Sequence, residues 1–124
     1  MTARELTDGL DGQLGGLESV WEGGMRTAYA HYRPRTAPGV ALAAAMVESA
    51  LLLQELGRRA PDPPHLLLGD LCLARASRLL AESRDQGLQV GFARAVEHVA
   101  AAAAGGSASP QLRPLLVDAI GARR

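Results

Sequence analysis

Apolar residues recur along this chain at helical spacing, and glycine and proline separate the runs. The most apolar run covers residues 40–56, and positions 40–47 carry no polar side chain, which predicts a helix buried on most sides. A second run, over residues 65–83, also has apolar residues on more than one face. A third, over residues 88–104, has a single apolar face. We expect these runs to form the central helices.

The two ends of the chain carry weaker signals. Leucine, valine and tryptophan in residues 14–21 share one helical face, but glycine pairs interrupt them, which predicts short or irregular helix. Residues 25–32 continue to a proline-containing loop at 33–39, and residues 111–120 predict a short last helix. The sequence therefore predicts one all-α domain over residues 1–124, a bundle of five to six helices.

Composition supports the helical prediction and excludes several functions. The chain has 23 alanines and 20 leucines but only 12 β-branched residues, which disfavours a β-rich fold. Thirteen basic and thirteen acidic residues cancel, so no strong field attracts nucleic acid or anionic lipid. All thirteen basic residues are arginine, which removes any mechanism that needs a catalytic lysine.

The same sequence favours a cytoplasmic protein without a membrane span. The apolar run 40–56 contains Glu48, Gln54 and Glu55, and no basic, apolar leader precedes it. The single Cys72 has no partner for an internal disulfide, which suits a reducing compartment.

Residues that could carry chemistry are scattered. His31, His65 and His98 lie on three different predicted elements, and no cysteine or histidine pair has metal-ligand spacing. Ser49 and Ser77 lie inside predicted helices, and the glycine pairs form no phosphate-binding fingerprint. From the residues alone, the chain is best interpreted as a helical interaction module with no active site and no bound cofactor.

One segment resembles a known family. The sequence from position 69 to 76 is Gly69-Asp70-Leu71-Cys72-Leu73-Ala74-Arg75-Ala76. It is similar to the Gly-Asp-x-Leu-Leu-Ala-Arg-Ala helix of trans-type polyprenyl diphosphate synthases. The apolar run 41–55, followed by Arg58 and Arg59, resembles the helix and Arg-Arg loop that precede it in that family, and the resemblance covers residues 38–106. It implies a truncated isoprenoid synthase fold.

The departures from the family pattern imply a non-catalytic role. Family members hold Mg²⁺ and the diphosphate with two aspartate-rich clusters, because the leaving group needs its charge neutralised. Where the first cluster is expected, this chain has Glu55 followed by arginines, and after the alanine-rich run the sequence offers only Asp118. The resemblance thus implies the small subunit of a heterodimeric hexaprenyl or heptaprenyl diphosphate synthase. Mg²⁺ is then expected on the catalytic large subunit, and the small subunit is required for activity and influences product length.

The resemblance also implies which residues meet the partner. Synthases of this family dimerise through helices that resemble 40–56 and 65–83, and the small subunit would help to close the partner's elongation tunnel. The implied interface residues are Met46, Glu48, Leu51, Leu53, Leu67, Asp70, Leu71 and Arg75. Arg58 and Arg59 are candidates for diphosphate binding, although an exposed loop pair is the plainer interpretation.

Plainer interpretations stay open for several other positions. Glu48 makes a buried polar contact with a subunit or marks the solvent face, and Asp70 pairs across an interface or caps the start of its own helix. The leucines at 51–53 are plain core rather than the floor of the elongation tunnel. A different class of protein, a homodimeric helical module without enzymatic role, fits the same alanine- and leucine-rich pattern. A stand-alone metal enzyme would need clustered carboxylates that this sequence does not offer.

Overall fold

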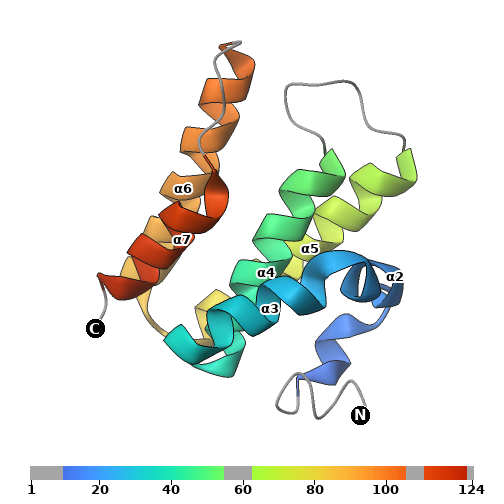
Figure 1. The fold of residues 1–124 in the computed structure, drawn as a ribbon, viewed down its shortest axis with the longest axis horizontal. Coiled ribbons are helices and arrows are strands. Elements are labelled where there is room, and N and C mark those ends of the chain that lie inside the picture. Colours follow the sequence, from blue (N-terminus) through green and yellow to red (C-terminus); the bar gives the residue numbers. More distant parts are fainter. Residues whose placement is uncertain (1–9, 55–62, 106–110, 123–124) are drawn as a thin grey trace.

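The computed structural model describes residues 10–54, 63–105 and 111–122 (Figure 1). All regular elements within these ranges are helical, so the all-α prediction is confirmed. In chain order the elements are η1 (Asp11–Leu14), α2 (Glu18–Val20), η2 (Trp21–Met25), α3 (Arg26–Tyr32), η3 (Arg33–Arg35), α4 (Pro38–Gln54), α5 (Pro63–Glu82), α6 (Gln86–Ala104) and α7 (Leu112–Gly121).

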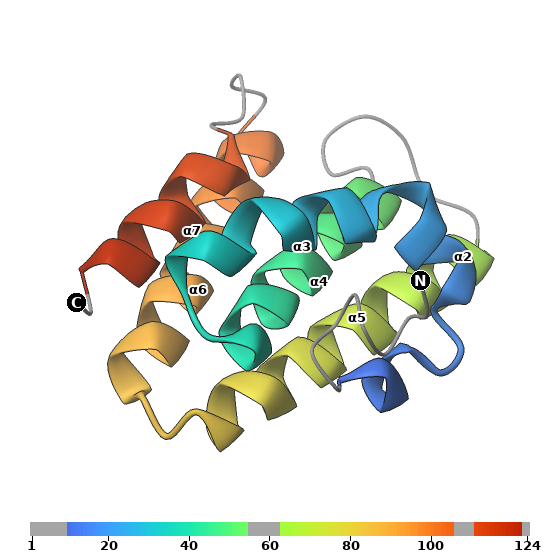
Figure 2. The same cartoon turned by 60° about the horizontal axis from the view of Figure 1, so that its bottom comes forward.

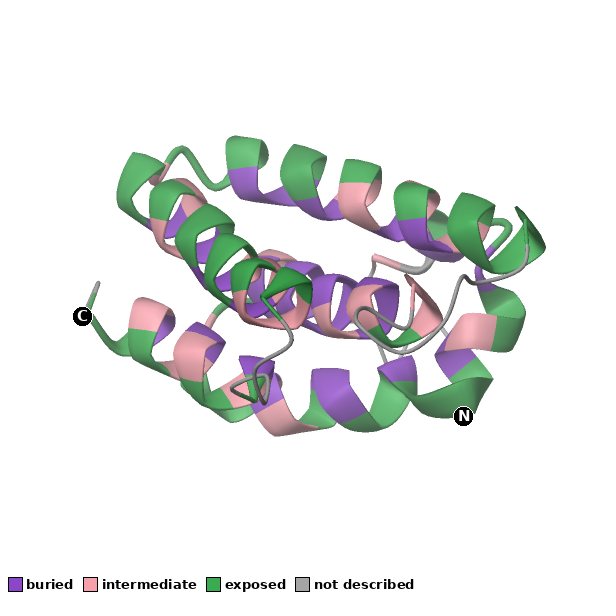
Figure 3. Cartoon of the chain, turned by 90° about the horizontal axis from the view of Figure 1, so that it is seen from above, coloured by how far each residue is buried: buried purple, intermediate pink, exposed green. Residues whose placement is uncertain are grey.

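Helix α4 is the centre of the fold. It begins at Pro38, whose fixed φ and missing N–H suit a first helical turn. No residue from 40 to 47 exposes more than 5% of its surface, which confirms the predicted burial on most sides. Figure 3 shows buried positions facing inward on the surrounding helices and exposed positions facing out. Because α4 has alanine at four of these eight positions, neighbouring helices can approach it closely.

Helix α5 packs along α4 as its antiparallel neighbour (Figures 1 and 2). The two helices pack closely at Gly69, where an added Cβ would lie 3.0 Å from Cγ of Gln54. A side chain at this position would need the flexible Gln54 side chain to shift by a few tenths of an ångström. Cys72, Ala76 and Leu79 continue the buried face of α5.

The N-terminal segments cover the other side of α4. Leu17, Trp21 and Met25 are buried, but the helix that carries them is irregular: residues 21–25 form a π-type turn with Gly24 at φ 149°. Only glycine adopts that conformation without strain, which explains why glycines interrupt the apolar pattern here. The predicted irregular helix is confirmed.

Helices α6 and α7 form a separate pair, which we call the C-terminal arm (residues 86–105 and 111–121). It lies beside α3 and α4 at one end of the molecule (Figures 1 and 2). Asp85 caps α6 by accepting a hydrogen bond from the backbone N–H of Leu88 at 3.1 Å. An added Cβ on Gly91 would lie 3.0 Å from Cβ of Ala119, so glycine allows α6 and α7 to touch.

The close contact between Gly91 and Ala119 leads to a stability prediction. A Gly91→Val substitution is expected to push α7 away from α6 and lower the free energy of unfolding by about 1–3 kcal/mol, as overpacking does. Chemical denaturation followed by circular dichroism measures the change. Ala101→Val, on the exposed face of α6, introduces the same side chain without the clash. Equal stability of the two variants would contradict the close contact.

Candidate interaction surface

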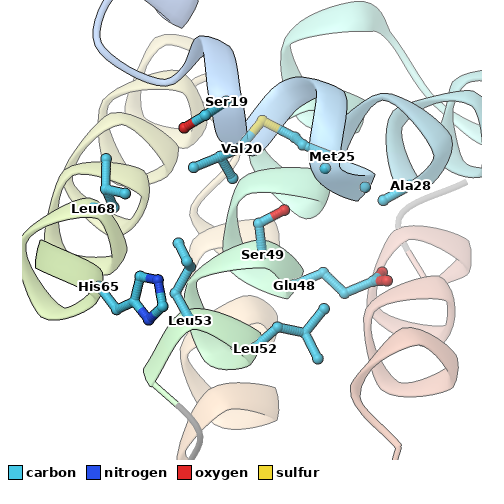
Figure 4. A pocket seen from close by; sticks show the side chains of 12 residues that line it. Ser19, Val20, Met25, Ala28, Glu48, Ser49, Leu52, Leu53, His65 and Leu68 are labelled. Atoms are coloured by element: carbon cyan, nitrogen blue, oxygen red, sulfur yellow. The ribbon is translucent and has the colours of Figure 1, made fainter. Parts of the chain in front are cut away.

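A cavity of about 360 Å³ opens between the N-terminal segments and the ends of α4 and α5 (Figure 4). Its apolar walls come from Val20, Met25, Leu53 and Leu68, on separate elements. The glycines of the π-type turn, Gly23 and Gly24, complete one wall, because they place backbone where side chains would otherwise fill the space. The irregular turn therefore shapes this cavity, which we call the end pocket.

Exposed leucines lie at the C-terminal end of α4 and near the start of α5. Leu52, on α4, exposes 73% of its surface and lines the pocket, and Leu67, on α5, exposes 70%. Leu66 beside it exposes 41%. The interpretation of Leu52 as plain core is wrong, because it lies on the side of α4 that no described neighbour covers. An exposed leucine in the wall of an apolar cavity, with further exposed leucines on the neighbouring helix, is typical of a protein-binding surface.

A few polar groups line the same pocket. Ser49 is 7% exposed, and Figure 4 shows its hydroxyl and the imidazole of His65 beside the cavity, while the Glu48 side chain lines it and points its carboxylate toward α7. Ser19 contributes a second hydroxyl from the N-terminal segment. An apolar pocket with a small number of hydrogen-bonding groups binds an apolar side chain and orients the polar group next to it.

Glu48 is the most highly connected polar residue beside the pocket. Its carboxylate accepts a hydrogen bond from the Tyr32 hydroxyl at 2.7 Å and two from the Arg113 guanidinium, at 2.6 and 3.1 Å. The Arg113 guanidinium also lies 5.8 Å from the centroid of the Tyr32 ring. These three residues, the Glu48 cluster, join α3, α4 and α7. The Glu48 side chain is 18% exposed and is held by Tyr32 and Arg113 of its own chain, so it does not mark the solvent face, and a polar contact with a subunit stays a prediction.

Burial and charge in the Glu48 cluster change the acidity of its members. Desolvation, and then the hydrogen bond to Glu48, raise the pKa of the Tyr32 hydroxyl well above its usual range. The hydrogen bond to Glu48 likewise raises the pKa of Arg113, which stays fully charged. Desolvation and the nearby charge of Arg113 lower the pKa of His31. At neutral pH the cluster thus contains a cationic Arg113 and a protonated Tyr32 hydroxyl.

The residues proposed for the interface differ in how far the structure buries them. Met46 has no exposed surface and packs in the core of this chain, so it offers nothing to a partner in this fold. Leu67 is exposed, and Leu53 is half-buried in the wall of the end pocket. Leu51 and Leu71 are half-buried and pack against the core. On α4, a large apolar side chain is left exposed near the C-terminal end, at Leu52.

The remaining proposed residues make contacts within the chain. Arg75 donates to the backbone carbonyl oxygens of Gln13, at 2.8 Å, and of Gly15, which fastens the N-terminal segment to α5. Asp70 is exposed and accepts a hydrogen bond of 3.4 Å from Gln54. It is the eighth residue of α5, so the alternative that it caps the start of its helix is wrong.

Several expectations concern metal, diphosphate or membrane. Arg58, Arg59 and Glu55 lie outside the described residues. Within the described ranges, no group of three or more histidine, cysteine, aspartate or glutamate side chains could hold a metal ion. No helix within those ranges is long and apolar enough to cross a membrane.

Sequence reasoning missed Leu52, Leu66 and the two partners of Glu48. The leucines lie in continuous apolar runs, where periodicity does not separate a buried face from an exposed one. The link from Glu48 to Arg113 spans 65 positions, and no local pattern marks it. A useful signal was available for Glu48 itself, because a carboxylate amid apolar residues needs a partner.

Comparisons of the chain with protein families, curated proteins and solved structures gave no significant match.

The elevated pKa of Tyr32 leads to a prediction about alkaline stability. The folded protein keeps the phenol proton to higher pH than the unfolded chain, in which tyrosine titrates near pH ~10. Its contribution to the free energy of unfolding is therefore complete below pH ~10 and is lost as pH rises further. Tyr32→Phe should lower stability by about 1 kcal/mol at pH 7 and flatten the decline above pH ~10.

Urea denaturation at several pH values measures this effect. Burial also raises the pKa of the Cys72 thiol to about 11. The thiol's contribution to the free energy of unfolding is therefore lost as pH rises above ~9, and Cys72→Ala should remove that part of the alkaline loss of stability. An unchanged pH profile in Tyr32→Phe would show that the hydroxyl is not held by Glu48.

Proposed function

We propose that this chain is the small, non-catalytic subunit of a heterodimeric long-chain polyprenyl diphosphate synthase, of the kind that makes isoprenoid quinone side chains in the cytoplasm. The segment from Gly69 to Ala76, similar to the second conserved helix of those synthases, supports the family. The catalytic large subunit would hold Mg²⁺ and both diphosphates. This chain would bind that subunit and influence the length of its product.

The exposed leucines of α4 and α5 carry the proposal. Leu52 and Leu67 lie on α4 and α5, the two helices that resemble the dimerising helices of the family. Exposing two leucines by 70% or more has a free-energy cost in water, and burying them against a second chain removes it. An interface centred on this end would cover the leucines and fill the end pocket with a side chain of the partner.

The same surface also supports the alternative, a homodimeric helical module. Two copies related by a two-fold axis could pair their leucines, since an apolar patch of this kind is self-complementary. The two candidates differ in the molecule that covers the patch, and they are separated by the mass and activity of the complex.

Substitution of the exposed leucines tests the proposed interface. A tagged chain purified from its native host should bring down a larger chain with two aspartate-rich motifs, and the complex should transfer prenyl groups. The Leu52→Glu and Leu67→Glu variants should weaken this complex at least about tenfold, because each places a charge in the interface. Val90→Glu, at an exposed valine on α6, introduces the same charge away from the patch and should bind normally.

Other outcomes would contradict the proposal. A purified chain that pairs only with itself, with Leu52→Glu abolishing the pairing, would establish the homodimeric module. Prenyl transfer by the isolated chain would exclude a non-catalytic subunit. An interaction with the large subunit that survives both leucine substitutions would place the interface elsewhere.

Filling the end pocket tests whether the partner enters it. An added Cβ on Gly23 meets no atom within 4 Å, so Gly23→Leu should fill the cavity without disturbing the fold. This variant should keep the thermal stability of the wild type and lose affinity for the large subunit. Gly12→Leu, at another glycine with open space, is the matched control. Unchanged affinity in Gly23→Leu, measured by calorimetric titration, would show that the partner does not enter the pocket.

A further inference from the structure

The connection between α5 and α6 is short and strained. Only residues 83–85 separate Glu82, the last residue of α5, from Gln86, the first of α6. Arg84 among them has φ 58°, the left-handed conformation that a residue with a side chain adopts at a cost. A short hinge under strain favours a state in which the hinge straightens and the helices on either side become continuous.

The arm that follows this hinge is a unit in itself. Helix α6 touches α7 at Gly91 and Ala119, and Leu88 and Phe92 are buried on α6. The α6–α7 pair would therefore keep its internal contacts if it moved as one piece.

The seam between the arm and the rest of the molecule is incompletely packed. A cavity of about 470 Å³ lies between them, with Val47, Leu73 and Leu80 on one side and Phe92 and Val96 on the other. Side chains that face a cavity lack contacts on that side, so separation of the seam costs less than separation of a filled one. The most specific attachment is the ion pair between Arg113 of α7 and Glu48 of α4.

We propose that the arm exchanges between two copies of this chain, which form a domain-swapped dimer. In that dimer α5 and α6 join into one continuous helix, and Arg84 adopts ordinary helical angles. Arg113 of each copy binds Glu48 and Tyr32 of the other. The occupant of the arm's binding site is a second copy, because that copy's arm reproduces each contact that the arm makes in the monomer. This inference does not depend on the proposed function, whose exposed leucines lie toward the other ends of α4 and α5, although Glu48 borders both the end pocket and the arm.

A charge-exchange experiment tests the swap. Glu48→Arg places two arginines together within one chain, and Arg113→Glu places two glutamates together, so neither variant alone forms the pair. A swapped heterodimer of the two variants satisfies both sites. At one site the two introduced side chains meet with opposite charges, and at the other the unchanged Glu48 meets the unchanged Arg113. Refolding the variants together should give a species of about twice the 13.0 kDa chain mass, with one copy of each.

Two further variants keep the test decisive. All of these chains also carry Leu52→Glu, which removes pairing through the leucine patch and so separates this test from that of the proposed function. If the charge variants do not fold alone, Arg84→Gly replaces them. Glycine relieves the hinge strain in the closed monomer, and the dimer fraction of the refolded protein should fall at least about fivefold.

Light scattering after size-exclusion chromatography reads out each result. The heterodimer in the mixture, and fewer dimers in Arg84→Gly, support the swap. Monomers in the mixture, together with restored thermal stability when both charge changes are placed in one chain, would overturn it, because the arm would then dock only on its own chain. A Leu52→Glu protein that stays monomeric after refolding at high concentration would overturn it as well.

Discussion

The carboxylate of Glu48 is the one polar group on which the arrangement of this fold depends. It lies in α4, the most apolar helix of the chain, and an unpaired charge there would be costly. Tyr32 of α3 and Arg113 of α7 both donate to it, so satisfying one carboxylate fixes the positions of two helices relative to the central one. Apolar packing around α4 tolerates small rotations and shifts of the neighbouring helices. The hydrogen bonds from the Tyr32 hydroxyl and the Arg113 guanidinium to the Glu48 carboxylate form only when those helices hold defined positions.

The end pocket and the C-terminal arm lie on either side of this cluster, and both depend on it. The Glu48 side chain lines the pocket, while its carboxylate holds α7. Glycines shape both regions because they lack side chains. Gly23 and Gly24 leave the space of the pocket open, and Gly91 lets α6 and α7 touch. The surface proposed for the partner and the arm proposed to exchange are therefore built around one central helix.

The sequence predicts the helices well and the surface poorly. Burial of residues 40–47 follows from an unbroken apolar run, and prolines and glycines place the helix boundaries to within a few residues. The exposure of Leu52 could not be predicted from the same run, because an apolar residue at the end of a buried helix has the same pattern whether or not a neighbour covers it. Arg75 illustrates the reverse difficulty: a charged residue suggested for an interface instead binds backbone carbonyls of its own chain.

A double-mutant cycle on Glu48 and Arg113 tests the central role of this carboxylate most directly. Urea denaturation of Glu48→Gln, Arg113→Met and the double variant gives the coupling energy between the two side chains. We predict about 1–2 kcal/mol, a value that allows for the partial exposure of Arg113. Effects that add to within about 0.3 kcal/mol would contradict the account, since α7 would then be held by apolar contacts alone.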